Sequence, residues 1–505
     1  MSRNGYACEQ GKWPKAQDIY NELHELTSKP IYCVSDAAYK DIVENYFDKQ
    51  CAKSKAITTE AKQYIPGGVQ HNLAFNKPFP MCMVKAEGAY LYDADGNKYF
   101  DFLQAGGPTI LGSNFPEVQE QAIELIKSCG PVTGLFHEAE LLLAKEINKH
   151  MPACEMFRML GSGTESVMAA IRVSRCATKN KRVIKVGGAY HGWSDQMVYG
   201  LKIPGSRNLL ESHGIPKGCY GSTDEVRPND LKMLEGMLRR NKLRGGTACV
   251  IVEPVGPESG TRPIDFDYNQ KALELAHKYG ALFIFDEVVT GFRMGLGGAQ
   301  GFFNVKPDLT IFGKIIAGGY PAAGGVGGKR EYISLMAAGV AGLGKKAYVG
   351  GTLAANPLSA YAGYCCIKAI EKYNACEKAG IAGDRLAAGL KVLVKKHNLP
   401  YVVYNQGSIV HLECTGAMSF DYSSFSFLKS ALGLLKNKPE MEARAEAMKD
   451  MGAAYMANGI VTLAGSRLYT SMADTDEIID GALERFDDVF KNVKVCPADR
   501  VFAKK

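Results

Sequence analysis

The stretch Ala281-Leu282-Phe283-Ile284-Phe285-Asp286 is a short apolar run that ends in a carboxylate. An uninterrupted apolar run of this length is typical of a strand buried on both faces of a parallel sheet. A second such run, Leu309-Thr310-Ile311-Phe312-Gly313, ends immediately before Lys314. Because open α/β sheets bind ligands at the carboxyl ends of their parallel strands, the two runs predict that Asp286 and Lys314 share one site.

A carboxylate and an amine at this edge suit pyridoxal 5'-phosphate. A lysine can form a Schiff base with this cofactor, and a carboxylate can pair with the protonated nitrogen of its pyridine ring. Lys314 and Asp286 are therefore our candidate catalytic residues. Taken alone, each is better explained as a surface lysine or as an aspartate that caps a helix. The surrounding motifs favour the cofactor site.

The rest of the chain predicts an α/β fold. Between about residues 115 and 355, strand-like runs such as 182–186 and 248–252 alternate with helical patterns. This alternation predicts a mainly parallel central sheet covered by helices on both faces. Around this large domain (115–355) we place an N-terminal helical extension (1–60), a strand-rich part (61–114) and a C-terminal α+β part (356–505). The last two parts together would form a smaller α+β domain.

Local signals refine these regions. Ser35 is a plausible N-cap for an amphipathic helical run over 37–46. The segments 89–92 and 98–102 flank a polar turn at 93–97, which predicts a β-hairpin. Helices are expected near 357–373 and 475–490, around a strand-like segment at 407–413.

A second chemical motif is Leu160-Gly161-Ser162-Gly163-Thr164-Glu165, which leads into a helical run. Small residues let backbone amides approach a phosphate, and a helix N-terminus adds unpaired N–H groups and a favourable dipole. The hydroxyl groups of Ser162 and Thr164 can add donors. A simple glycine-rich helix cap has the same pattern, so this motif indicates a phosphate site mainly in combination with Lys314.

The composition excludes several classes of protein. A net charge of +7 spread over 505 residues gives no reason to expect a nucleic-acid partner. The 14 cysteines form no CxxC pairs, and Cys365-Cys366 lacks metal-ligand spacing, so reduced thiols and no metal site are expected. The N-terminal residues lack a signal-peptide pattern, and no apolar run is long enough to span a membrane. We therefore expect a cytoplasmic enzyme without a membrane partner.

Six motifs in a fixed order resemble the class III pyridoxal-phosphate aminotransferases. Two of them contain Asp286 and Lys314, and a third is the Ser162 motif described above. The other three are Ile65-Pro66-Gly67-Gly68-Val69, Gly107-Pro108-Thr109-Ile110-Leu111-Gly112 and Gly350-Gly351-Thr352-Leu353-Ala354-Ala355-Asn356-Pro357. The resemblance spans roughly residues 55–490. Within the family, it is strongest to the glutamate-1-semialdehyde 2,1-aminomutases.

The resemblance implies a fold-type I pyridoxal-phosphate enzyme with a defined set of cofactor contacts. Lys314 would carry the cofactor, and Asp286 would contact the ring nitrogen. The phosphate would be held by Ser162, Gly163 and Thr164, and by Thr352 of the neighbouring subunit, which implies a homodimer with a shared active site. The remaining contacts would be Tyr190 stacking on the ring, Val288 on its opposite face and Glu253 near its edge. We regard His191 as a structural neighbour.

The sequence departs from the aminomutase pattern at four positions. The segment 70–75, which includes Leu73, contains no arginine where the family has one near the substrate carboxylate, and Gly106 replaces a tryptophan. Ser466 replaces an acidic residue, and Arg467 beside it is either a substitute clamp for a carboxylate or a surface arginine.

We therefore favour an aminotransferase that moves an amino group between an amino acid or amine and a 2-oxo acid or aldehyde by a ping-pong mechanism. An intramolecular aminomutase of the glutamate-1-semialdehyde type is the first alternative, and an amino-acid racemase or epimerase is the second. A binding protein that has lost catalysis is disfavoured because Lys314 is present.

Overall fold

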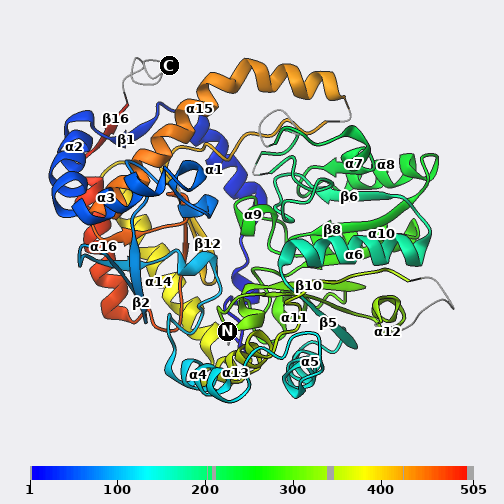
Figure 1. The fold of residues 1–505 in the computed structure, drawn as a ribbon. Helices are drawn as coiled ribbons and strands as arrows, with labels where there is room; N and C mark the ends of the chain where they lie inside the picture. The colour runs from blue at the N-terminus through cyan, green and yellow to red at the C-terminus, as the bar shows by residue number, and fades with distance from the viewer. Residues whose placement is uncertain are drawn as a thin grey trace.

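The computed structural model describes residues 3–74, 76–201, 203–206, 212–337, 346–424 and 426–496. Its centre is a seven-stranded sheet with the strand order β5-β11-β10-β9-β8-β6-β7 (Figure 1). The strands are β5 (Met156–Leu160), β6 (Arg182–Val186), β7 (Thr223–Val226), β8 (Thr247–Val252), β9 (Leu282–Asp286), β10 (Leu309–Gly313) and β11 (Gly324–Gly328). Only β11 runs antiparallel to its neighbours in this sheet. The prediction of an α/β fold with a mainly parallel sheet is confirmed.

Helices cover both faces of this sheet because its strands are apolar on both sides. On one face, Ile171 packs with Ile284 and Ile251. On the other face, Phe283 packs with Phe302. The first face is covered by α6 (Gly163–Thr178), and the second by α8 (Leu231–Lys242), α10 (Tyr268–Lys278) and α11 (Gly298–Phe303).

Two smaller sheets stand beside the central one. The strands β12 (Val402–Gln406), β13 (Ile409–Glu413) and β15 (Arg467–Tyr469) form an antiparallel sheet. A four-stranded sheet has the order β14-β4-β3-β2, with β2 (Met83–Glu87), β3 (Tyr90–Asp93), β4 (Lys98–Asp101) and β14 (Ile460–Val461). The antiparallel pair β3 and β4 is the predicted hairpin. Since β14 pairs with β4, N-terminal and C-terminal segments build this sheet together, as predicted for the smaller domain.

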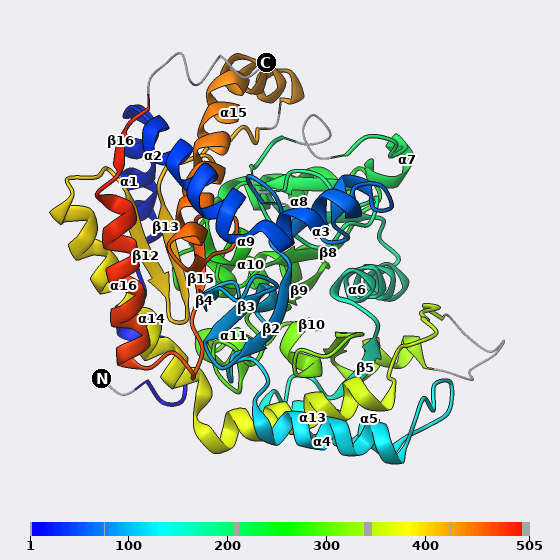
Figure 2. The ribbon, with the colours of Figure 1, turned by 60° about the vertical axis from the view of Figure 1, so that its left-hand side comes forward.

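The C-terminal half adds long helices around these sheets (Figure 2). They are α14 (Ala375–Lys396), α15 (Phe427–Ala457) and α16 (Asp476–Phe490), and α14 packs on β12, β13 and α16. α13 (Pro357–Tyr373) instead packs against α4 (Pro116–Ser128) and α5 (Glu138–His150). α13 begins after the domain boundary that we propose at residue 355, but it packs against helices of the large domain that lie before this boundary. The shorter helices are α7 (Lys217–Tyr220), α9 (Pro257–Gly260) and α12 (Arg330–Ile333).

The N-terminal extension is mostly helical and packs against other segments of the same chain. It contains α1 (Ala16–Ser28), β1 (Tyr32–Val34), α2 (Asp36–Asp41), a π-helix (Ile42–Gln50) and α3 (Ala52–Ala61). Ser35 caps α2 by accepting a hydrogen bond from the backbone of Ala38, as predicted. Near the C-terminus, β1 pairs with β16 (Val493–Val495). Trp13, near the start of the extension, packs against Phe303 of α11, so the extension contacts both domains. Among the described residues, no helix is long and apolar enough to cross a bilayer.

Candidate active site

Asp286 ends β9 at the carboxyl edge of the central sheet, and its buried carboxylate has two partners. One oxygen accepts a hydrogen bond from the backbone N–H of Val288 (3.1 Å), and the other lies 2.7 Å from Nδ1 of His191. Burial lowers the pKa of His191, although Asp286 opposes this change. The imidazole is therefore neutral at neutral pH, and its Nδ1–H donates to the carboxylate. His191, which we regarded from the sequence as a structural neighbour, is thus the direct partner of Asp286.

Lys314 begins a short 3₁₀ helix directly after β10, the strand beside β9. Its φ angle of 50° is uncommon for a residue with a side chain, and such angles cluster at functional sites. The Nζ atom donates a hydrogen bond to the carbonyl of Gly106. Burial lowers the pKa of Lys314, and the charges of Arg467 and Arg293 lower it further against the opposing effect of Tyr469. The amine therefore loses its proton at a lower pH than a surface lysine.

Val288 connects the lysine and the glycine-rich motif. A Cβ atom placed on Gly163 would lie 3.0 Å from the Val288 side chain, and one on Gly313 would lie 2.9 Å from it. Gly163 begins α6, whose N-cap is Ser162. On the other side of this motif, Gly192 approaches Thr164 so closely that a Cβ there would lie 2.4 Å from the threonine hydroxyl. The structure therefore brings the predicted phosphate motif, the Tyr190 segment and the Lys314 strand end together.

Glu253 is buried at the end of β8 and accepts three backbone hydrogen bonds. They come from Tyr190 (2.9 Å), Glu258 (2.9 Å) and Ser259 (2.7 Å). Burial, together with the nearby negative charges of Glu258 and Asp286, raises the pKa of Glu253 to about 8. Its role in the described structure is to hold the Tyr190 segment against the loop at Glu258 and Ser259. The Tyr190 side chain itself is half exposed.

Arg467 is buried, so its interpretation as a surface arginine is wrong. Its guanidinium forms an ion pair with a carboxylate oxygen of Glu258 (2.9 Å) and also donates to the carbonyl of the same residue (2.6 Å). Glu258 and Ser259 have φ angles of 54° and 55°, which are strained for residues with side chains. Arg467 is therefore a buried cation whose charge acts on Lys314, and Glu258 is its carboxylate partner.

A strained loop forms the wall next to Lys314. Gln104, Ala105, Gly106 and Gly107 all have positive φ angles. Arg293 is fully buried and holds this loop through the Gln104 side chain (3.1 Å) and the Gly107 carbonyl (2.8 Å). Its other nitrogen donates to Ser408 and Thr470 of the smaller domain. Arg293 therefore joins both domains behind the lysine.

Two of the four positions that depart from the aminomutase pattern lie at this wall. A Cβ on Gly106 would lie 3.9 Å from Nζ of Lys314 and 3.7 Å from the Leu73 side chain. Ser466 is buried directly before Arg467. Glu258, Arg293 and Tyr469 had no signal of their own in the sequence, because contacts between distant segments bring them to the site.

Thr352 has an exposed side chain, and it follows Gly351, which approaches Glu165 of the same chain.

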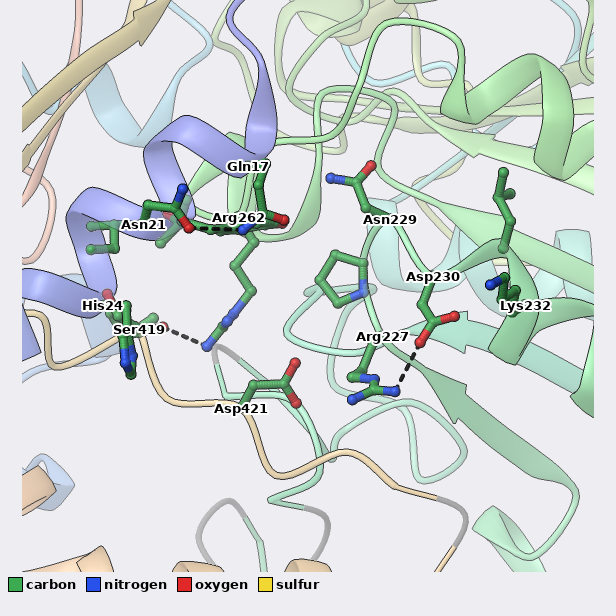
Figure 3. Close-up of a pocket in the computed structure, with 16 residues that line it drawn as sticks. Gln17, Asn21, His24, Arg227, Asn229, Asp230, Lys232, Arg262, Ser419 and Asp421 are labelled. Atoms are coloured by element: carbon green, nitrogen blue, oxygen red, sulfur yellow. Dashed lines mark hydrogen bonds and ion pairs between the residues drawn. The ribbon is translucent and has the colours of Figure 1, made fainter.

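A separate cavity of about 780 Å³ lies between α1, the start of α8 and residues 418–421 (Figure 3). Its lining includes Arg262, which donates to the carbonyls of Met418 and Phe420, but none of the predicted site residues.

Residues 74–490 match the family described as aminotransferase class III. The chain is 37% identical over 442 residues to a glutamate-1-semialdehyde 2,1-aminomutase of Acetivibrio thermocellus, covering 86% of this chain and 96% of that protein. An ω-transaminase from Sphaerobacter thermophilus has a similar structure, with a TM-score of 0.76 at 25% identity, covering 89% of this chain and 99% of that one. A glutamate-1-semialdehyde aminomutase from Pseudomonas aeruginosa has a TM-score of 0.75 at 19% identity, covering 94% and 98% of the two chains.

The fold and the site define a pyridoxal-phosphate-dependent enzyme of fold type I. The chain belongs to the class III aminotransferase family. Its residues fit the cofactor: an amine of lowered pKa, a buried carboxylate oriented by a neutral histidine, and a glycine position at a helix N-terminus where a Cβ would meet Val288. These groups provide what the carbonyl, the pyridine nitrogen and the phosphate of pyridoxal phosphate require.

Proposed function

We propose that this enzyme transfers an amino group between an amino acid or amine and a 2-oxo acid or aldehyde, in two half-reactions. The observation that carries the proposal is the buried Arg467 beside Lys314, held by Glu258. A guanidinium binds a carboxylate in a bidentate manner, so an incoming carboxylate can replace Glu258 as its partner. The site can therefore bind the amino donor and the carbonyl acceptor one after the other, and at least one of these two substrates carries a carboxylate.

We infer the following roles for the side chains. Lys314 carries pyridoxal phosphate, which supplies a carbonyl for the incoming amine and a protonated ring that accepts electrons. Asp286 pairs with the ring nitrogen and keeps it protonated, while His191 orients the carboxylate. Ser162, Gly163 and Thr164 bind the phosphate, and Tyr190 and Val288 contact the two faces of the ring. The Nζ atom of Lys314 takes the proton from the substrate carbon and later returns it.

An intramolecular aminomutase is the second candidate. The observation that favours it is the 37% identity to a protein named glutamate-1-semialdehyde 2,1-aminomutase. Against it stand the departures at Gly106 and Leu73, at the wall next to Lys314, where a tryptophan and an arginine are expected, and at Ser466, where an acidic residue is expected. We therefore place transamination first.

The test is a half-reaction with the pyridoxal form of the enzyme. A panel of amino acids and amines is added singly, and the loss of visible absorbance of the lysine-bound cofactor is recorded together with the keto or aldehyde product. Pyruvate or 2-oxoglutarate is then added, and the absorbance should return. If no pair of substrates produces this cycle while glutamate-1-semialdehyde is rapidly converted to 5-aminolevulinate, the aminomutase is correct. Inversion of an amino acid without a keto product would instead support a racemase.

The variant Arg467→Gln should raise KM for a carboxylate-bearing acceptor by roughly tenfold to a hundredfold, with a smaller change in kcat. The reason is the loss of a charge-assisted contact worth about 1.5–3 kcal/mol. Glu258→Gln should shift KM in the opposite direction, because it weakens the contact that the acceptor must displace. Steady-state kinetics with carboxylate-bearing and carboxylate-free acceptors measures both changes.

The matched control is Arg385→Gln, which removes an exposed arginine that pairs with Asp480 on the surface. We expect its kinetic constants to remain those of the wild type. If Arg467→Gln raised KM equally for both kinds of acceptor, the role of Arg467 as a carboxylate clamp would be wrong.

We also propose a homodimer in which Thr352 reaches the phosphate bound by the partner. Thr352 is exposed, and the large apolar side chains of Trp193, Tyr348 and Leu353 are 72%, 72% and 62% exposed in the single chain. A contiguous apolar surface is typical of a protein interface, and Tyr348 and Leu353 lie close to Thr352 in the chain. Light scattering during dilution should show that dissociation and loss of cofactor occur together. A monomer that retains the cofactor fully would contradict this proposal.

A further inference from the structure

Residues 3–13, which we call the N-terminal strap, lie between the two domains (Figure 1). Ala7 is fully buried there, and its backbone N–H donates to the carbonyl of Met294 in the large domain (2.8 Å). Its carbonyl faces the smaller domain, where Cβ atoms placed on Gly380 and Gly407 would lie only 2.0 Å and 2.7 Å from the oxygen. At this point the backbone of the strap fills the space between the domains.

The side chains near Ala7 hold the strap on both sides. Arg3 is buried, and its guanidinium donates to the carbonyl of Ala7 and forms an ion pair with Asp384 of α14. Tyr6 packs against the large domain, where a Cβ on Gly295 would lie 2.3 Å from its ring. Glycines of both domains therefore leave the room that the strap occupies.

The rest of the strap continues along the large domain. The Gln10 side chain donates to the carbonyl of Phe302 (2.7 Å), and the Trp13 indole donates to that of Ile264 (2.8 Å). The Trp13 ring also packs edge-on against Phe303, with 5.0 Å between the ring centres. Because the family match covers residues 74–490, the resemblance assigns no role to this segment.

The strap reaches both domains directly beside Arg293. Met294, which accepts the hydrogen bond from Ala7, is the next residue in the chain. Gly407, which lies against the Ala7 carbonyl, precedes Ser408, and the Ser408 hydroxyl accepts from the Arg293 guanidinium (3.1 Å). The strap and this guanidinium therefore join the same two segments at adjacent residues.

The guanidinium of Arg293 also holds the wall of the active site. Its second terminal nitrogen donates to the Gln104 side chain (3.1 Å) and to the Gly107 carbonyl (2.8 Å). Between these two residues, the carbonyl of Gly106 accepts the hydrogen bond from Nζ of Lys314. Each step from the strap to the amine is therefore a hydrogen bond, a close contact or a neighbouring residue in the chain.

We propose that the N-terminal strap is a positioning element of this active site. By fixing the two domains on either side of Arg293, it holds the Gly106 carbonyl where this oxygen orients the amine of Lys314. The amine moves a proton only when it points at the substrate carbon, so a wall that shifts with the domains slows this step. The inference rests on the role of Lys314 in the proposed function.

Two variants release the strap from opposite sides. Gly380→Ala places a methyl group against the backbone of Ala7, while alanine is the better residue for the helix α14 itself. Arg3→Gln removes the ion pair with Asp384 from the strap. In both variants, hydrogen–deuterium exchange measured by mass spectrometry should become faster in residues 5–13 and 103–108, while β9 stays protected.

The rate constant of a single first half-reaction, measured with the amino donor that the substrate panel identifies, should fall roughly tenfold in both variants. Partial unfolding would lower the amplitude of this reaction and leave its rate constant unchanged, so the rate constant separates positioning from stability. The double variant should have the rate constant of either single variant, because both changes remove the same contact.

Each variant has a matched control. Gly389→Ala changes a second glycine of α14, where the new Cβ would lie 2.2 Å from the end of the Leu483 side chain, which can rotate away. Lys12→Gln removes an exposed cation of the strap that pairs only with Glu9 at 2.7 Å among the contacts of its ammonium group in the described structure. We expect both controls to keep the exchange pattern and the rate constant of the wild type.

The proposal is wrong if Gly380→Ala and Arg3→Gln expose the strap while residues 103–108 and the rate constant match those of the controls. It is also wrong if neither variant changes the exchange of residues 5–13, because the contacts described above then do not hold the strap. The exchange measurement uses no substrate. It can therefore fail while transamination is confirmed, and it can succeed whichever reaction the enzyme catalyses.

Discussion

Lys314→Ala should lose the covalently held cofactor and at least about 10⁴-fold of kcat, because the substitution removes both the attachment point and the proton-transfer group. Borohydride reduction followed by peptide mass analysis should label residue 314 in the wild type and leave the variant unlabelled. We expect the variant to remain folded, because the substitution removes only part of one buried side chain and a single hydrogen bond, from Nζ to the Gly106 carbonyl.

Lys329→Ala is the control for this experiment. Lys329 follows β11 in the same sheet and pairs with Asp308 at 2.8 Å. This variant should keep the label at residue 314 and the kcat of the wild type. Labelling at another lysine in Lys314→Ala, with retained turnover, would contradict the assignment.

The sequence predicted the central sheet well wherever its strands consist of apolar side chains. β8 and β9 are mainly apolar, and each is buried along its whole length, as is β6, which also contains Arg182 and Lys185. β11 had no such signal, because four of its five residues are glycines. The structure explains them: a Cβ on Gly324 would lie 2.3 Å from the carbonyl oxygen of Ser162, and one on Gly328 would lie 2.5 Å from that of Asp308. The elements beside this strand pack so closely that it must lack side chains. The pattern of apolar and polar residues along a sequence carries no information about such packing.

The positions of Asp286 and Lys314 at the sheet edge were predictable from short local motifs. Asp286 is the last residue of β9, and Lys314 directly follows the neighbouring parallel strand β10. Arg467 was ambiguous because nothing in its local sequence shows that Glu258, more than two hundred positions earlier, is its partner. The same reason explains why Arg293 and Tyr469 were missed. Their roles come from contacts between the smaller domain and the central sheet.

Asp286→Asn should lower kcat by roughly 10³-fold, because the neutral amide cannot keep the pyridine nitrogen of the cofactor protonated and the ring then accepts electrons poorly. The amide has the shape of the carboxylate, and its single oxygen can still accept the hydrogen bond from Nδ1 of His191, but the contact with the backbone N–H of Val288 is then lost. We therefore expect the thermal unfolding midpoint to fall modestly, by far less than the loss of kcat would require if it came from unfolding. Single-turnover kinetics with a large excess of amino donor measures the loss at the chemical step.

Asp308→Asn gives the matched comparison in the same sheet. Asp308 is also a buried aspartate with a histidine partner, lying 2.7 Å from His277, but it precedes β10 at the opposite end of the strand from Lys314. Burial alone would raise the pKa of Asp308, but hydrogen bonds from Lys329, the Phe283 backbone and His277 hold it below its ordinary value. A lowered pKa stabilises the fold above the pKa of the unfolded aspartate, near 3.9, and this contribution disappears as the pH falls through the folded value. Asp308→Asn should therefore lower the unfolding midpoint at neutral pH, lose this difference in acid, and keep its kcat. Equal losses of kcat in the two variants would show that Asp286 acts only on stability.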